Sequence, residues 1–256
     1  MELWKNEYIT VNKFTRPGKK LTAVRKIVLH WTANPGASAE DHHKYFNGTA
    51  IKNETYASAH LFVDTKEAIC IIPLDEVAYH ANDQYEKVKG VPYRGVPELL
   101  PNANYLSISV EMCVEKDGSI ADATIERAAK IIAVLCKSHK LTENDIVRHY
   151  DITHKPCPEP FVDHPTRFEE FKQRVHQLLN PKPVTSASSN KDIYPFKGIL
   201  KVGSKGEEVK KVQKRLNVKV DGIFGPNTEK ALKEFQKKNK ITVDGIVGKI
   251  TWGKLF

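Results

Sequence analysis

Long apolar runs are absent from this chain of 256 residues, of which 40% are hydrophobic. The first residues, Met1–Glu7, are interrupted by charged and polar side chains. A secretory signal needs an apolar stretch of about 7–15 residues, and a transmembrane helix needs about 20. We therefore expect a chain that is synthesised in the cytoplasm without a signal peptide, and that has neither a membrane span nor a membrane partner.

Cysteine is scarce and its spacing is irregular. The four cysteines lie far apart and form no C-x-x-C pair. In a chain made without a secretory signal they are most simply reduced thiols, so we predict no disulfide. Three of them, Cys70, Cys113 and Cys136, lie in apolar segments and are expected to be packing residues.

Acidic residues are in short supply only in the last quarter of the chain. Residues 191–256 carry 16 Lys and Arg against 7 Asp and Glu, whereas 24 of each precede them, so the net charge of +9 lies in this tail. Such a tail suits an anionic polymer, an anionic lipid or nucleic acid, or it is a solvated lysine face. Nucleic acid is disfavoured because aromatic residues are sparse among these lysines and no standard binding motif is present.

Two soft metal ligands lie close together in the segment from Arg148 to Cys157. His149 and Cys157 offer an imidazole and a thiolate, which together suit zinc, and a catalytic zinc takes three protein ligands and one water. His30 is the best candidate for the third ligand because it ends the apolar run Ile27–Leu29. On residue types alone a second interpretation stays open, in which Cys157 is a buried small hydrophobe and His149 a hydrogen-bonded core histidine.

A carboxylate interrupts another strand-like segment. Residues 106–114 alternate, with Ile108, Val110 and Met112 on one face and Glu111 on the other. Burying a charge costs several kcal/mol unless it is paired or used. Glu111 therefore has either a basic partner or a functional role.

Several segments of the first 180 residues occur in the order found in one enzyme family. The order resembles that of the zinc N-acetylmuramoyl-L-alanine amidases of the type 2 family, which are related to peptidoglycan recognition proteins. A match of several motifs in order is specific. The matching segments are Ile27–Ala33, Ala57–Asp64, Val77–Ala81, Ser107–Glu111 and His149–Cys157.

The resemblance implies an α/β domain with a mixed central sheet flanked by helices, and Zn²⁺ held by His30, His149 and Cys157. It implies hydrolysis of the amide bond between N-acetylmuramic acid and L-alanine in bacterial peptidoglycan. Glu111 would be the catalytic acid and base, and Lys155 would face the developing oxyanion. Pro156 would restrict the backbone beside these groups.

Two further histidines are expected near the substrate rather than on the metal. His80 resembles the family position that lines the substrate groove. His60 is a second groove or supporting residue, although a partly buried strand histidine is an equally good interpretation. Some relatives carry a tyrosine just before the His60 position, whereas this chain has Ala59, which puts more weight on Glu111.

Periodicity predicts the main elements of the first 180 residues. Residues 73–105 are rich in Pro, Gly, Asn and Tyr and predict a long ordered loop. A last helix is predicted to begin at Thr166, with Glu169 completing a capping box. We expect strands at 21–29, 59–64, 68–72, 106–114 and 145–147, and helices at 38–46 and 122–139.

The tail contains an internal repeat. Val220–Gly225, with Thr228 and Leu232, recurs as Val243–Gly248, with Thr251 and Leu255, and each copy predicts a glycine turn followed by a helix. This resembles the small all-α, three-helix peptidoglycan-binding module of wall hydrolases. A stabilising appendage without a ligand is the alternative.

The predicted organisation is a catalytic domain at 1–180, a Pro- and Ser-rich linker at 181–196 and a binding module at 197–256. We expect a monomer whose partner is peptidoglycan, acting at the cell wall as a phage-type endolysin or an autolysin. Two other functions stay open: a peptidoglycan-binding protein without hydrolysis, and a cysteine hydrolase that uses Cys157 and His149.

Overall fold

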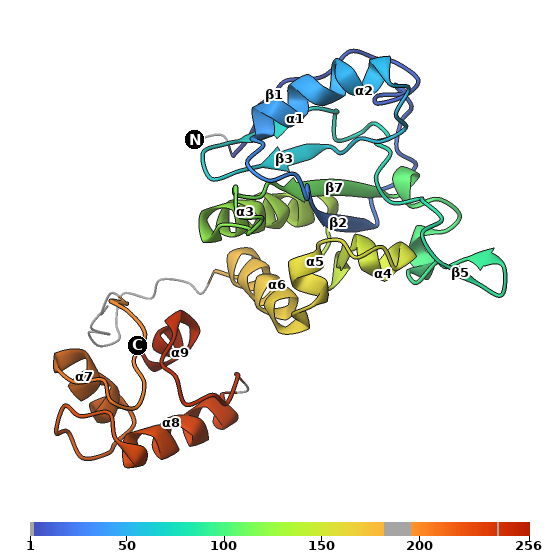
Figure 1. Cartoon of the computed structure of the whole chain (residues 1–256). Helices are drawn as coiled ribbons and strands as arrows, with labels where there is room; N and C mark the ends of the chain where they lie inside the picture. Colours follow the sequence, from blue (N-terminus) through green and yellow to red (C-terminus); the bar gives the residue numbers. More distant parts are fainter. Residues whose placement is uncertain (1–2, 182–195, 240) are drawn as a thin grey trace. The chain divides into compact units, whose positions relative to one another are not determined.

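The computed structural model describes residues 3–181, 196–239 and 241–256. The chain divides into two compact units, residues 1–183 and 184–256 (Figure 1). Each unit has apolar core residues of its own. The predicted linker at 181–196 lies outside the described residues except at its two ends. No helix in the described ranges is long and apolar enough to cross a membrane.

The first unit is built on one six-stranded mixed sheet, as predicted. Its strand order is β1-β4-β3-β7-β2-β8, and every neighbouring pair is parallel except β3 and β4, which form an antiparallel hairpin. The strands are β1 (Lys5–Asn6), β2 (Lys26–Trp31), β3 (Leu61–Val63), β4 (Ala68–Cys70), β7 (Ser107–Met112) and β8 (Ile146–Arg148).

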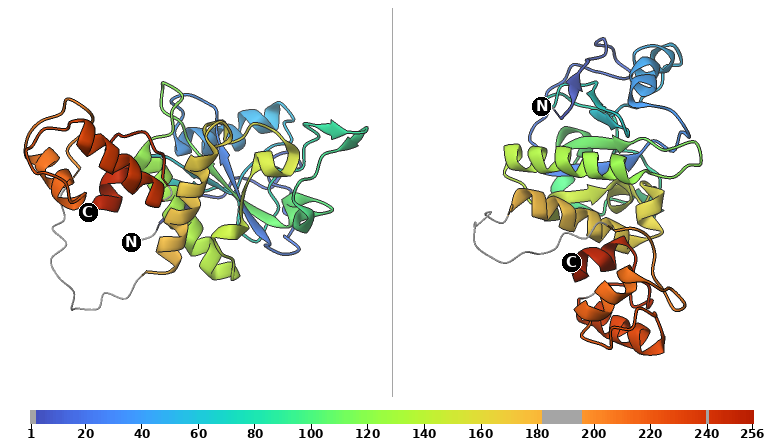
Figure 2. Two further views of the ribbon diagram at one scale, coloured as in Figure 1. Left: turned by 90° about the horizontal axis from the view of Figure 1, so that it is seen from below. Right: turned by 90° about the vertical axis from the view of Figure 1, so that its left-hand side faces the viewer.

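The two faces of the sheet have different partners (Figures 1 and 2). One face packs against α3 (Asp122–His139), which in turn contacts α6 (Pro165–Leu179). Ile108, Val110 and Met112 point to this side and belong to its core. The other face is covered by α1 (Ala39–Phe46), by α4 (His149–Thr153) and by the loop between β4 and β7.

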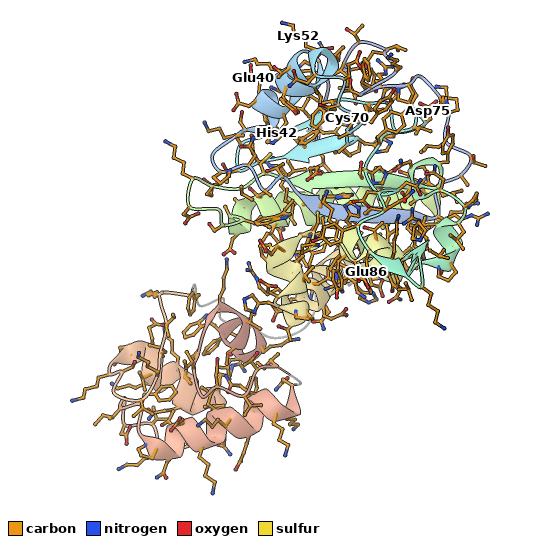
Figure 3. The ribbon with its side chains drawn as sticks, turned by 45° about the vertical axis from the view of Figure 1, so that its right-hand side comes forward. Glu40, His42, Lys52, Cys70, Asp75 and Glu86 are labelled. Atoms are coloured by element: carbon orange, nitrogen blue, oxygen red, sulfur yellow. The ribbon has the colours of Figure 1, made fainter. Side chains whose placement is uncertain are left out.

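Helix α1 covers the second face near β3. Its N-terminus is closed by a capping box, because the Ser38 side chain accepts a hydrogen bond from the Asp41 amide and the Asp41 carboxylate accepts one from the Ser38 amide. His42 extends from this helix over β3 (Figure 3) and stacks on Phe62 with ring centroids 4.9 Å apart. Only 7% of His42 is exposed, so it is a buried residue of this packing.

Two predicted starts differ from the structure. Strand β2 begins at Lys26 rather than at residue 21, because residues 21–25 form irregular hydrogen bonds with the β4–β7 loop and with Leu106. Helix α6 has no capping box at Thr166 and begins at Pro165. Proline suits the first helical position, where its fixed φ is helical and a missing N–H costs nothing.

The long loop at residues 73–105 is ordered, as predicted, and contains short elements. They are β5 (Lys87–Val88) and β6 (Val91–Pro92), which pair as a hairpin, and the 3-10 turns η1 (Pro97–Leu99) and η2 (Ala103–Tyr105). The other short helices of this unit are α2 (Thr49–Lys52), η3 (Glu143–Asp145) and α5 (Glu159–Val162).

The second unit is helical, as predicted. Its described residues include α7 (Glu207–Arg215), α8 (Pro226–Lys238) and α9 (Lys249–Leu255), which pack on a core that contains Phe224 and Trp252. Helices α8 and α9 each begin directly after a glycine that ends one copy of the repeat.

The repeat is also visible in the hydrogen bonds of two buried glutamines. Gln213 donates to Asp221 Oδ1 (2.8 Å), Ile223 O (2.9 Å) and Thr228 Oγ1 (3.1 Å), and its Oε1 accepts from the Gly222 amide (2.8 Å). The second copy repeats this pattern around Gln236, with Asp244, Ile246, Thr251 and Gly245 as partners.

Candidate metal centre

Strands β2 and β7 place His30 and Glu111 side by side. The two residues are register partners near the carboxyl ends of adjacent parallel strands. Side chains alternate along a strand, so both lie on the face opposite to α3, with Val28 on the same side as His30. The imidazole Nδ1 of His30 lies 4.0 Å from Glu111 Oε1.

Strand β8 delivers the next histidine. His149 follows β8 as the first residue of α4, and 3% of it is exposed. The chain then returns at Cys157, whose carbonyl accepts a hydrogen bond from the Tyr150 amide at 3.0 Å. This bond closes the segment on itself and holds the thiol beside the end of β2.

The three side chains predicted as metal ligands come together. One ligand atom from each of His30, His149 and Cys157 lies within 4.8 Å of the other two. His30 Nδ1 and Cys157 Sγ are 3.5 Å apart. Tetrahedral zinc with Zn–N of about 2.0–2.1 Å and Zn–S of about 2.3 Å separates such a pair by roughly 3.6 Å. The donor set and this spacing therefore fit zinc.

Burial changes the protonation of the cluster. It holds the pKa of His30 well below the usual histidine value, and the neighbouring His149 and His80 add to the effect. Burial also raises the pKa of the Cys157 thiol, and the nearby Glu111 carboxylate raises it further. A neutral imidazole is ready to bind a metal, whereas the thiol must first lose its proton.

Glu111 is the carboxylate of the site. Its side chain is 17% exposed, and Oε2 is one of the few buried side-chain oxygens without a hydrogen-bond partner in the described chain. Burial raises the pKa of Glu111 to about 8, although the charge of Lys155 acts in the opposite direction. Within residues 3–181 no Lys or Arg side chain forms an ion pair with Glu111, so the alternative of an Arg or Lys partner does not apply.

Lys155 is exposed, two residues before Cys157. Its charge is close enough to lower the pKa of both His30 and Glu111. It is therefore an exposed cation near the buried cluster.

His80 and His60 continue the row of imidazoles behind His30. His30 Nε2 lies 3.2 Å from His80 Nδ1, and the rings of His80 and His60 have centroids 5.8 Å apart. His60 has no exposed surface, and its ring contacts Ser109 Oγ and Glu76 O at 2.9 Å each. His60 is thus enclosed by neighbouring segments, which fits the supporting role, whereas 9% of His80 is exposed. The placement of either residue in a substrate groove stays a prediction.

Asp83 is a residue of this cluster that sequence reasoning missed. Its Oδ1 lies 3.0 Å from His149 Nε2. Burial raises the pKa of Asp83, but the hydrogen bond and the charge of His149 outweigh this and lower it overall. Asp83 lies in the long loop, where no periodicity indicates which side chain turns inward.

Comparison with known proteins agrees with this geometry. Residues 20–160 match the family described as N-acetylmuramoyl-L-alanine amidase, and residues 205–255 match a putative peptidoglycan binding domain. The N-acetylmuramoyl-L-alanine amidase BlyA of Bacillus subtilis is 55% identical over 193 residues, which are 75% of this chain and 52% of BlyA. This chain thus matches about half the length of that relative.

Two other proteins extend the similarity. A probable N-acetylmuramoyl-L-alanine amidase of Bacillus licheniformis is 47% identical over 260 residues, covering 89% of this chain and 72% of the relative. The catalytic domain of XlyA superposes with a TM-score of 0.53 and 28% identity, covering 67% of this chain and 97% of that domain. With its sheet, its His-His-Cys cluster and these matches, the chain belongs to the N-acetylmuramoyl-L-alanine amidase family.

Proposed function

We propose that this chain hydrolyses the amide bond between N-acetylmuramic acid and L-alanine in peptidoglycan, and that the reaction depends on zinc. The single observation that carries the proposal is the convergence of His30, His149 and Cys157 beside a buried carboxylate oxygen of Glu111 that has no partner. A buried group of this kind costs stability, so its presence at a donor cluster favours a chemical role.

Amide hydrolysis needs a nucleophile and a proton carrier. A zinc ion held by the three ligands would polarise the carbonyl and lower the pKa of water from about 15.7 toward about 7. Glu111 would accept a proton from the attacking water as the oxygen–carbon bond forms. It would then give that proton to the leaving nitrogen as the carbon–nitrogen bond breaks, which yields a carboxylic acid and a free amine.

The charges around Glu111 suit this role. Without an ion its pKa is about 8, and a divalent cation at the adjacent ligands would lower it toward neutrality. Lys155 would face the oxyanion that develops on the carbonyl, because its exposed ammonium can approach the substrate while its charge acts on the site.

The cysteine-hydrolase alternative is less well supported. A nucleophilic cysteine is usually a thiolate with a lowered pKa. Here burial raises the pKa of Cys157, and 6% of the residue is exposed. The thiol is better suited to a metal, which would hold it deprotonated.

Digestion of purified peptidoglycan, with mass analysis of the products, tests the proposal. We expect products that carry free L-alanine amines, activity that is lost on chelation and activity that returns with zinc. Cys157→Ser should be inactive, whereas Cys136→Ser, at a buried thiol of α3, should remain active. Activity that survives chelation but is lost with iodoacetamide would indicate the cysteine hydrolase, and zinc binding without any product would indicate a binding protein.

We also propose that residues 1–180 form the catalytic domain, that 181–196 connect the units and that 197–256 bind the cell wall. Support comes from the match of residues 205–255 and from the excess of basic residues in this region. Tethering would raise the local concentration of the enzyme on an insoluble polymer. In a wall pull-down assay, the full chain should bind more strongly than residues 1–180, and equal binding would remove this proposal.

A further inference from the structure

The two histidines of the metal centre have different partners at Nε2. His149 Nε2 contacts the Asp83 carboxylate at 3.0 Å, whereas His30 Nε2 contacts a second imidazole, His80 Nδ1, at 3.2 Å. An ionised carboxylate has no proton to donate and can only accept a hydrogen bond. In a neutral imidazole, this contact therefore fixes the ring proton of His149 on Nε2. Nδ1 is then the nitrogen of His149 that is left for a metal.

The Nε2 of His30 has a neutral hydrogen-bond partner instead of a carboxylate. Its Nδ1 faces Cys157 at 3.5 Å, so its ring proton belongs on Nε2, where it donates to His80. His80 in turn lies 3.4 Å from Ser107 Oγ through Nε2. Both partners of this chain are neutral, and a neutral acceptor raises the basicity of a ligand less than a carboxylate does.

Asp83 is placed by contacts on both sides of its loop. The Arg94 guanidinium donates to the Asp83 carbonyl at 2.8 Å. The Gly95 amide donates to Ile152 O of α4 at 3.1 Å, and a Cβ at Gly95 would lie 2.2 Å from the Asp151 carbonyl. The loop therefore lies directly on the helix that begins with His149.

A second carboxylate on the same loop has a similar contact outside the cluster. Glu86, labelled in Figure 3, lies 2.6 Å from His154 Nδ1, and Tyr93 stacks on His154 with centroids 3.6 Å apart. His154 does not belong to the cluster of His30, His149 and Cys157. The loop thus forms two carboxylate–histidine contacts with the same segment, and only one reaches a ligand.

We propose that Asp83 is a positioning residue for the metal centre, which fixes the ring proton and orientation of His149 and thereby strengthens metal binding. This rests on the proposed zinc dependence. Loss of such a partner typically weakens metal affinity about 10- to 100-fold. Asp83 does not contact the reacting atoms, so its effect on turnover passes through the metal.

The test is the zinc affinity of the full chain, measured by competition with a chromophoric chelator at fixed pH. Asp83→Asn should weaken zinc binding about 10- to 100-fold, because an amide can also donate and so no longer selects one ring tautomer. Glu86→Gln is the matched control and should bind zinc as the unchanged chain does. Equal losses in both variants would show a general effect of the loop and overturn the inference.

A second measurement needs no variant. Nitrogen NMR of the histidine rings in the metal-free chain should show the His149 proton on Nε2, and a proton on Nδ1 would overturn the inference. Failure of the proposed function gives a different result. If the unchanged chain releases wall fragments without binding zinc, zinc dependence fails, whereas normal zinc binding by Asp83→Asn overturns only the role of Asp83.

Discussion

The histidine and cysteine cluster of the first unit and the two buried glutamines of the second unit differ in how their polar atoms are paired. In the second unit, Gln213 and Gln236 are almost completely buried, and each uses both ends of its amide in the same set of hydrogen bonds. In the first unit, Glu111 is partly buried and its buried Oε2 has no hydrogen-bond partner, and His30 and Cys157 face each other within a cluster of donors.

This difference distinguishes buried polar groups that stabilise the fold from those that are retained for a chemical function. A satisfied buried amide stabilises one particular turn, and the repeat uses the same solution twice. A buried carboxylate without a partner reduces stability and persists where it has a function. Removing a buried polar group should therefore stabilise the first unit at its site and destabilise the second.

The largest expected effect comes from Glu111→Gln. The change keeps the size of the side chain and removes its ability to carry a proton, so amidase activity should fall about 10²- to 10⁴-fold. Zinc affinity should change little, because Glu111 is not one of the three proposed zinc ligands. Product formation from peptidoglycan and zinc titration measure the two quantities. Activity within threefold of the unchanged chain would remove Glu111 from the mechanism.

The same variant should change how stability depends on pH. The pKa of Glu111 is raised from 4.5 to about 8 in the folded metal-free chain, so between these values the folded state binds the extra proton. The stability of the unchanged chain should then fall as pH rises from about 4.5 to about 8 by up to several kcal/mol. Glu111→Gln should lose this part of the slope, whereas Glu115→Gln, at an exposed position, should keep it.

A smaller and opposite effect is expected for Gln213→Met. Methionine fills similar space but leaves the Gly222 amide and the Asp221 carboxylate without their buried partner, at a cost of about 2–4 kcal/mol. Calorimetric unfolding of the second unit measures the loss. Gln236→Met should cost the same within about 1 kcal/mol, because its partners and distances repeat those of Gln213. A large difference between the two losses would mean that the two copies of the repeat, although alike in their hydrogen bonds, do not contribute equally to stability.

The sequence predicted most elements because their patterns are local. The alternation of residues 106–114 placed Glu111 opposite to Val110, and the helical spacing from Asp122 to His139 gave the bounds of α3 as observed. The start of α6 was missed because Thr166 and Glu169 form a capping pattern that competes with proline at the first helical position. Only the backbone around His164 and Pro165 decides between them.

The candidate site was predicted from the order of motifs along the sequence rather than from any geometric pattern. Family resemblance indicated His30, His149 and Cys157, and parallel strands with a short return loop bring them together. Nothing in the local pattern distinguishes the enclosed His60 from a groove residue, because burial depends on Glu76 and Ser109 from other segments. Asp83 was missed for the same reason, since its contact spans 66 positions.

The smallest expected effect concerns how the metal centre responds to pH. Burial raises the pKa of the Cys157 thiol above its usual value and lowers that of His30. Between about pH 6 and 8 the metal-free site should thus hold a protonated thiol and a neutral His30. Zinc binding should release the thiol proton, and Glu111 should add a further fraction because the ion lowers its raised pKa. Zinc affinity would then rise at least about tenfold per pH unit. Calorimetric titration in buffers of different ionisation enthalpy gives the number of protons released. A value near zero would mean that the thiol is already ionised in the metal-free chain. The burial of Cys157 would then not control metal binding.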